Sequence, residues 1–269
     1  MREKIAGKRL LVFDWGIGGL PLFHKIRGAF PAAALVYLSD SGNIPYGKQT
    51  ARQLQERLLQ IAAFARGEGI SLTAVACNAM SSVLGGASSV CGGVEFLSLI
   101  HTFCAHITGA EKTARARGAE KRIGIIGGIR TLESGIYQKA FTEAGYRVSS
   151  CATQELSALI EAGDITGIPQ VLEKAFSVLG AIDELVLACT HYPAAAPLIR
   201  EMRPSLSLVD PGDALYAECA RRLGGADTPD AGPARLYTTG DARLAAASAH
   251  KAFGFDGLCF QSLPLDLNA

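Results

Sequence analysis

The chain carries the run Leu72-Thr73-Ala74-Val75-Ala76-Cys77-Asn78 and, later, the run Glu184-Leu185-Val186-Leu187-Ala188-Cys189-Thr190-His191-Tyr192-Pro193. In both, a short apolar stretch stops at Ala-Cys and a small polar residue follows. A bounded apolar stretch of this length is typical of a strand buried in a parallel sheet. Because open α/β sheets bind ligands just beyond the carboxyl ends of their strands, we expect the thiols of Cys77 and Cys189 to reach a ligand.

Outward from these two runs, short β-branched stretches alternate with longer amphipathic segments. Strands are predicted at residues 9–13, 34–38, 72–77, 122–126, 146–150, 183–188, 207–209 and 235–238. Helices are predicted at residues 19–29, 50–66 and 132–143, with further helical stretches between the later strands. This order indicates an α/β fold in which crossover helices join the strands of mostly parallel sheets.

The two halves of the chain correspond at one offset. Cys189 lies 112 residues after Cys77, and Gly127, which ends a predicted strand, lies 113 residues after Asp14, which ends another. We therefore expect two similar units, and the Gly- and Ser-rich segment 85–93 is expected to lead toward the change of unit. Two thiols delivered by two such units point to one site with a sulfur on each side. That arrangement can take a proton from one face of a carbon and return one to the other.

Composition narrows the class of protein. The 269 residues are 49% hydrophobic, which is enough for one large or two modest domains. Lys plus Arg number 26 against 25 Asp plus Glu, and without a basic stripe we expect no nucleic-acid partner. The apolar runs are too short to span a bilayer and the first residues do not resemble a signal peptide, so we expect no membrane association. Seven scattered cysteines favour the reducing cytoplasm over a disulfide framework.

Each candidate residue also has an ordinary structural interpretation. A cysteine at a strand end is often a small buried hydrophobe, but the matched contexts of Cys77 and Cys189 favour chemistry. Both are expected to open a helix, whose dipole would lower the pKa of the thiol. Asp14 is either a functional carboxylate at a strand end or a helix cap. His191, two residues after Cys189, is a candidate general acid.

Two groups of residues could suggest a cofactor or metal site, but neither matches the standard sequence pattern of such a site. The glycine-rich turn after Asp14 lacks the third glycine of a dinucleotide fingerprint, because Pro21 stands there. A loose group of thiol and imidazole residues matches no standard zinc pattern and is interpreted as helix core; its members are Cys91, His101, Cys104 and His106. We expect neither a metal nor an organic cofactor.

Taken together, the motifs resemble the glutamate racemase family, within the aspartate/glutamate racemase superfamily. The matching runs are Val12-Phe13-Asp14, Gly16-Ile17-Gly18-Gly19-Leu20, Ile44-Pro45-Tyr46-Gly47, Ala76-Cys77-Asn78 and Cys189-Thr190-His191-Tyr192-Pro193. The likeness covers residues 8–260. It implies two pseudo-symmetric α/β domains with the active site in the cleft between them, a discontinuous first domain (1–98 and 211–269) and a second domain (99–210). It also implies a cofactor-independent isomerase that supplies D-glutamate for peptidoglycan, and a homodimer.

The resemblance also implies a role for each matched residue. Cys77 and Cys189 would be the two bases, with Cys77 acting on the D-enantiomer and Cys189 on the L-enantiomer. Asp14, His191 and Glu161 would support proton movement. The substrate would be a small amino acid or related carboxylate. Asn78 and Thr190, which follow the two cysteines, would hold its α-carboxylate. Pro45, Tyr46 and Gly47 would hold its side-chain carboxylate.

Several positions depart from the family pattern at this expected site. Trp15 replaces a Ser, Ala79 replaces a Thr, Gly128 replaces a Thr, and Arg130 replaces a Gly. The substrate would lose three gripping hydroxyls, at roughly 1–3 kcal/mol for each missing hydrogen bond. Three hypotheses follow: a glutamate racemase with altered contacts, the same two-thiol chemistry on a different small carboxylate, or a non-catalytic ligand-binding or regulatory homologue.

Overall fold

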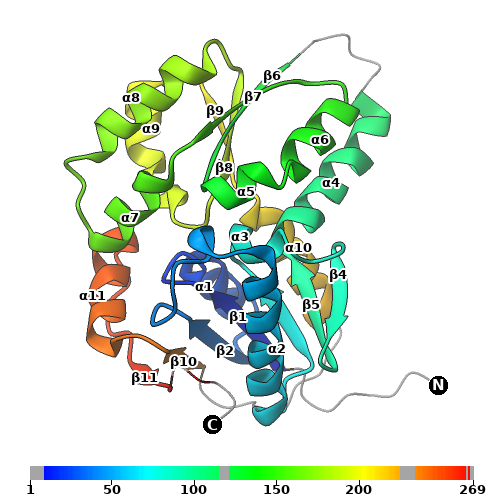
Figure 1. Ribbon diagram of the computed structural model, residues 1–269, viewed down its shortest axis with the longest axis vertical. Helices are drawn as coiled ribbons and strands as arrows, with labels where there is room; N and C mark the ends of the chain where they lie inside the picture. The colour runs from blue at the N-terminus through cyan, green and yellow to red at the C-terminus, as the bar shows by residue number, and fades with distance from the viewer. Residues whose placement is uncertain (1–8, 115–120, 225–233, 265, 267–269) are drawn as a thin grey trace.

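The computed structural model describes residues 9–114, 121–224, 234–264 and 266, and it contains two sheets flanked by helices (Figure 1). The first sheet has seven strands in the order β11-β10-β2-β1-β3-β5-β4. Its strands are β1 (Arg9–Asp14), β2 (Ala34–Ser39), β3 (Leu72–Val75), β4 (Ser88–Cys91), β5 (Val94–Ser98), β10 (Arg235–Thr238) and β11 (Phe260–Ser262). All of their pairings are parallel except that between β4 and β5. The associated helices are α1 (Leu20–Ala29), η1 (Tyr46–Lys48), α2 (Ala51–Gly67), α3 (Asn78–Ser81), α10 (Gly212–Leu223) and α11 (Ala242–Phe253).

The second sheet has four parallel strands in the order β7-β6-β8-β9. Its strands are β6 (Arg122–Gly127), β7 (Arg147–Ala152), β8 (Glu184–Ala188) and β9 (Ser207–Val209). The helices of this part of the chain are α4 (Leu99–Ala114), α5 (Ile129–Glu133), α6 (Ile136–Glu143), α7 (Gln154–Ala162), α8 (Ile168–Leu179), η3 (Tyr192–Ala195) and α9 (Ala196–Met202). The α/β class with helix-flanked parallel sheets is therefore as the sequence predicted.

The strand triplet β2-β1-β3 is repeated as β7-β6-β8. The β1–β2 pair Arg9↔Ala34 has its counterpart in Arg122↔Arg147, where both residues are 113 positions later. The β1–β3 pair Leu10↔Leu72 likewise corresponds to Ile123↔Glu184, at offsets of 113 and 112. The repeat seen in the sequence is thus a repeat of hydrogen-bonding register. It brings the carboxyl ends of β3 and β8, and the cysteines that follow them, to equivalent places.

The two sheets share a core. One cluster of buried side chains contains Leu10 and Val12 of β1 together with Ile123 and Ile125 of β6. Helices α1, α4, α6 and α10 pack against one another between these strands. A continuous apolar core holds the two units together and fixes the geometry of any site between them.

The chain returns to the first sheet near its end. Strand β10 pairs with β2, β11 pairs with β10, and α11 contacts α7 from the other unit; Figure 1 shows α11 beneath α7. This strand membership supports a discontinuous first domain, and we propose its boundaries near residues 98 and 211.

One segment has structure that its composition did not indicate, and one local expectation was wrong. The segment 85–93 contains β4, which pairs antiparallel with β5 through a turn in which Gly92 and Gly93 have positive φ angles of 54° and 79°. Glycines adopt this conformation readily, so the Gly- and Ser-rich run closes a hairpin just before the proposed change of unit. The single helix expected at 132–143 is two helices, α5 and α6, separated at Gly135, whose φ of 67° cannot continue an α-helix.

Candidate active site

A cavity of about 620 Å³ lies beyond the carboxyl ends of β1, β3, β6 and β8. Its lining includes every site residue predicted from the sequence: Asp14, Trp15, Pro45, Tyr46, Gly47, Cys77, Asn78, Ala79, Gly128, Glu161, Cys189, Thr190 and His191. The packing therefore gathers residues from both repeats, up to 177 positions apart, around one volume. A concave site at the ends of parallel strands is the usual place for a ligand in this class of fold.

Cys77 occupies the first-sheet side, directly after β3 and before α3. Burial raises the pKa of the Cys77 thiol well above its usual value, and the Asp14 carboxylate raises it further. The expectation that a helix dipole would lower this pKa was wrong, because α3 is a single turn and desolvation of the thiolate outweighs its field. Burial thus favours the thiol form of Cys77 over the thiolate.

Asp14 ends β1 and is almost completely buried. Its Oδ2 accepts a 2.6 Å hydrogen bond from Thr190 Oγ1, and its Oδ1 accepts one of 2.7 Å from the Trp15 backbone N–H. Burial raises the pKa of Asp14, although His191 and these two donors act in the opposite direction. Asp14 is thus a carboxyl group that can exchange a proton with its surroundings more readily than a surface aspartate.

Cys189 lies on the second-sheet side, at the end of β8. Its Sγ is 3.8 Å from His191 Nδ1, and His191 Nε2 is 2.5 Å from Glu161 Oε2. Burial alone lowers the pKa of His191, but its contacts with Cys189 and Glu161 raise it well above the usual value. A thiol, an imidazole and a carboxylate therefore form one connected chain at this side of the cavity. The first helical residue after Cys189 is Tyr192 of η3, so this cysteine does not open a helix directly.

The glycine-rich turn after β1 has a steric role in this arrangement. A Cβ atom at Gly18 would lie 2.5 Å from Thr190 Oγ1 and 2.8 Å from His191 Nδ1, and one at Gly16 would lie 2.8 Å from Glu161 Oε2. Only hydrogen atoms at these two positions allow the second-sheet residues to approach the first sheet. The absence of side chains at Gly16 and Gly18 thus allows the two halves of the site to lie close together.

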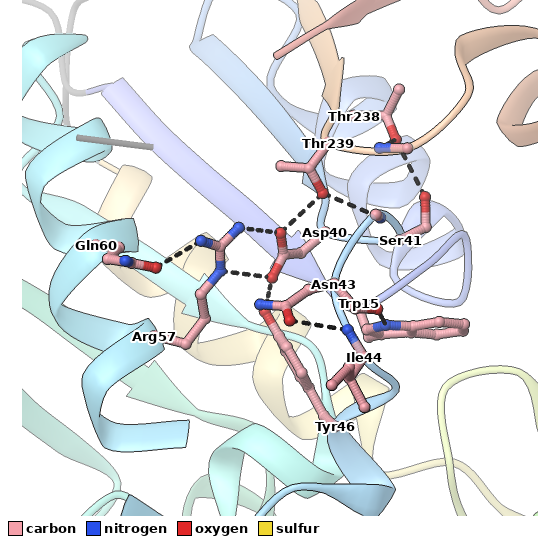
Figure 2. Close-up of polar contacts among 12 residues, drawn as sticks. Trp15, Asp40, Ser41, Asn43, Ile44, Tyr46, Arg57, Gln60, Thr238 and Thr239 are labelled. Carbon is pink, nitrogen blue, oxygen red and sulfur yellow. Dashed lines mark hydrogen bonds and ion pairs between the residues drawn. The ribbon is translucent and has the colours of Figure 1, made fainter. Parts of the chain in front are cut away.

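A buried polar network holds the loop that carries Tyr46 and Gly47 (Figure 2). Asp40 is its centre: it accepts hydrogen bonds from Tyr46 Oη (2.5 Å), Arg57 Nε (2.8 Å) and Thr239 Oγ1 (2.9 Å). Arg57 comes from α2 and Thr239 from the end of β10, so two segments outside the loop hold it in place. Sequence analysis missed Asp40 and Arg57 because nothing in their local pattern distinguishes them from surface charges.

Trp15 forms one wall of the cavity. Its indole Nε1 donates a 2.9 Å hydrogen bond to the Asn43 carbonyl, as Figure 2 shows. The ring packs with Ala79 against the buried cluster that contains Cys77. The two positions where the resembling family has hydroxyls therefore present an apolar surface here.

Several lining residues were not singled out from the sequence. They are Ser41, Lys48, Thr131, Gln154, Ser157, Ala158, Ala162, Ala188, Gly240, Asp241, Leu244, Ala245, Ala247, Ser248 and Lys251. Many belong to α7 of the second unit and to α11, which follows the return of the chain to the first sheet. Asn78 also has a buried partner, since its Oδ1 accepts a 2.7 Å hydrogen bond from Tyr137 Oη. These relationships depend on tertiary packing and leave no periodic signal.

Within the described part of the chain, no three His, Cys, Asp or Glu side chains come together in a way that could hold a metal ion. In the same residues, no helix is both long and apolar enough to cross a bilayer.

Comparison with known proteins agrees with the architecture. Residues 22–219 match the family model described as Asp/Glu/Hydantoin racemase. The chain belongs to this racemase family. A glutamate racemase of Pseudomonas syringae pv. tomato is 35% identical over 243 residues, which cover 86% of this chain and 84% of the relative. A glutamate racemase of Cupriavidus pinatubonensis is 34% identical over 258 residues, which cover 89% and 90%.

Solved structures of the family have the same fold. Glutamate racemase from Thermus thermophilus, solved with beta-chloro-D-alanine, aligns with a TM-score of 0.78 and 25% identity, over 97% of this chain and 98% of that one. Glutamate racemase from Francisella tularensis, solved with D-glutamate, aligns with a TM-score of 0.80 at 20% identity, over 97% and 98%, which shows likeness of fold. Membership of this family makes the chain an isomerase of the racemase type, as the sequence predicted.

Proposed function

We propose that the protein is an amino-acid racemase that uses Cys77 and Cys189 as opposed acid and base, with glutamate as the best single substrate. The observation that carries this proposal is the placement of the two thiols. They follow equivalent strands, β3 and β8, of a register-matched repeat and line one cavity.

The reaction needs one base on each face of the α-carbon. One sulfur, as thiolate, takes the α-proton, and the opposite thiol gives a proton to the other face of the carbanion, which inverts the centre and leaves the second sulfur as thiolate. By family resemblance Cys77 acts on the D-enantiomer and Cys189 on the L-enantiomer. An α-proton is a very weak acid, so the site must be closed to water and rich in donors placed where negative charge develops.

Each thiol lies beside a residue that can accept or donate its proton. Asp14 lies against Cys77 and can take its proton when the thiolate is needed. His191, paired with Glu161, lies against Cys189 and can do the same on the other side. Each thiol thus has its own partner for proton transfer.

The substrate contacts follow from the same placement. Asn78 and Thr190 are proposed to hold the α-carboxylate, and Pro45, Tyr46 and Gly47 the side-chain carboxylate. Curated relatives in this family are named glutamate racemases. Supply of D-glutamate for peptidoglycan would then be the product's use.

One observation favours a substrate other than glutamate. Trp15 and Ala79 replace hydroxyl-bearing residues with an apolar wall that is fixed by the hydrogen bond to Asn43. Another amino acid or small carboxylate with a less polar surface would pack against this wall. The proton-transfer chemistry would be unchanged.

The deciding experiment is α-proton exchange in deuterated water, followed by NMR, with both enantiomers of glutamate, aspartate and a panel of other amino acids. Exchange and inversion of glutamate, with inversion lost in Cys77→Ala and in Cys189→Ala, would support the proposal. Cys259→Ala is the matched control, because that exposed cysteine does not line the cavity. If only another amino acid exchanges its α-proton, that amino acid is the substrate instead of glutamate. If no amino acid of the panel exchanges its α-proton, the result favours a non-catalytic binding protein.

A further inference from the structure

The side chain of Gln154 extends into the cavity from the first residue of α7. Its base is fixed, because the preceding Thr153 donates its N–H to the Gly127 carbonyl (2.9 Å) and bonds Tyr192 Oη through its side chain (2.9 Å). Tyr192 Oη in turn donates to the Thr153 carbonyl at 2.7 Å. The carboxamide is therefore carried by a well-anchored helix start.

The carboxamide oxygen occupies space left by two glycines. A Cβ at Gly47 would lie 2.8 Å from Gln154 Oε1, and a Cβ at Gly128 would lie 2.9 Å from the same atom. Gly47 belongs to η1 of the first unit and Gly128 is the N-cap of α5 of the second. Gln154 thus fills a gap across the cleft that exists only because neither position has a side chain.

The hydrogen bonds of Gln154 leave one donor for a ligand. Its Oε1 accepts from the Ile129 backbone N–H at 3.3 Å, and its Nε2 donates to Ser157 Oγ at 3.2 Å. A carboxamide nitrogen carries two hydrogens, and the second has no recorded partner among the described residues. That donor lies at the edge of the cavity beside Gly47, where the proposed substrate places its side-chain carboxylate.

We propose that Gln154 is a specificity-determining residue that donates a hydrogen bond to the side-chain carboxylate of the substrate. The inference rests on the proposed racemase function and extends it: the loss of a threonine at 128 makes room for a longer donor that reaches the same volume from α7. A side chain at 128 would therefore compete with the present position of the Gln154 carboxamide for the same space.

This competition for space gives a sharp test by a double-mutant cycle. The four proteins are wild type, Gly128→Thr, Gln154→Ala and the double variant. Trp15 is the only tryptophan and lines the cavity, so its fluorescence reports glutamate binding without turnover. Racemisation then gives KM and kcat separately.

Gln154→Glu keeps the shape of the side chain but removes the donor and adds a negative charge. We expect it to raise both Kd and KM for glutamate by roughly 10- to 100-fold, as for the loss of a hydrogen bond to a charged group, with a smaller change in kcat. Gly128→Thr should weaken binding strongly in the wild-type background and little or not at all in Gln154→Ala. Gln170→Glu, an exposed change on α8, is the charge-matched control and should bind as wild type.

The outcomes separate the two proposals. If wild type binds glutamate and exchanges its α-proton, and Gln154→Glu binds glutamate with the same Kd, the proposed role of Gln154 is overturned. Equal effects of Gly128→Thr in both backgrounds would overturn the competition for space. Wild type that neither exchanges glutamate nor changes its Trp15 fluorescence would overturn the glutamate function itself, and the inference with it. Thermal unfolding of each variant identifies any that fail to fold, and Gln154→Glu, which keeps the volume of the side chain, then decides the question.

Discussion

Thr190 and Asp14 join the two repeats through one 2.6 Å hydrogen bond at the floor of the cavity. Thr190 follows β8 and Asp14 ends β1, so each sheet contributes one partner. The bond sets the distance between the halves of the site, and it is possible only because Gly18 has no side chain. Small changes at this floor should therefore alter chemistry more than stability.

Gly18→Ala tests the closeness of the two halves directly. The new methyl group would lie 2.5 Å from Thr190 Oγ1, so Thr190 and His191 must move away from Asp14. A displacement of about 1 Å can cost about 100-fold in rate, and we expect a loss of racemisation of that order in a folded protein. Gly28→Ala is the control: its methyl group would meet nothing within 4 Å, and it should keep full activity.

Asp14→Asn should separate stability from activity. Folding raises the pKa of Asp14 above 3.8, so the folded state binds this proton more tightly. The resulting stabilisation is complete below pH 3.8 and is lost as the pH rises through the raised value, because the ionised carboxylate is desolvated at this buried position. We expect Asp14→Asn to unfold at a higher temperature than wild type at pH 7 by a few degrees, about 1 kcal/mol, while activity falls sharply. A lower midpoint at pH 7 would contradict this account.

Glu161→Gln should change the pH dependence of stability. Folding raises the pKa of His191 above 6.5 through Cys189 and Glu161, so its contribution is complete below pH 6.5 and is lost as the pH rises through the folded value. We expect the thermal midpoint of wild type to decline with pH above 6.5 more steeply than that of Glu161→Gln. Parallel profiles for the two proteins between pH 5.5 and 9 would show that Glu161 does not raise this pKa.

Arg57→Met should unfold more easily than wild type, because it leaves the Asp40 carboxylate buried without its cation. Both members of this pair are at least 95% buried, and removal of one partner costs about 3–5 kcal/mol. Urea unfolding should show this loss, with a smaller loss in Asp40→Asn/Arg57→Met. If the double variant were as unstable as the sum of the single ones, the network around Asp40 would not act as a unit.

Trp15→Ser/Ala79→Thr restores two hydroxyls without disturbing Gln154. If glutamate is the substrate, we expect tighter binding and a lower KM, by roughly 10-fold for each recovered hydrogen bond. Isothermal titration measures the affinity, since the fluorescent residue is removed. No gain over wild type would show that these positions do not decide specificity.

Much of the site could be predicted because strand ends carry a local signal. Asp14, Cys77 and Cys189 each follow an apolar run, and the repeat places them together without further information. Gln154 could not be predicted, since its position depends on gaps at Gly47 and Gly128 that close only in three dimensions. The pKa of Cys77 was misjudged for a related reason: the helix after it was expected from sequence, but its burial depends on tertiary packing with residues as distant in sequence as Leu11 and Tyr237.

The hydrogen bond from Thr239 to Asp40 has a consequence for synthesis. The loop that carries Tyr46 is made early, yet one of the partners that fix it lies almost 200 residues later. Strands of the second sheet leave the ribosome before β10 can pair with β2, and domains generally fold in the order of synthesis. We therefore expect the nascent chain to complete its second sheet first and to acquire a formed active site only after β10 has left the ribosome.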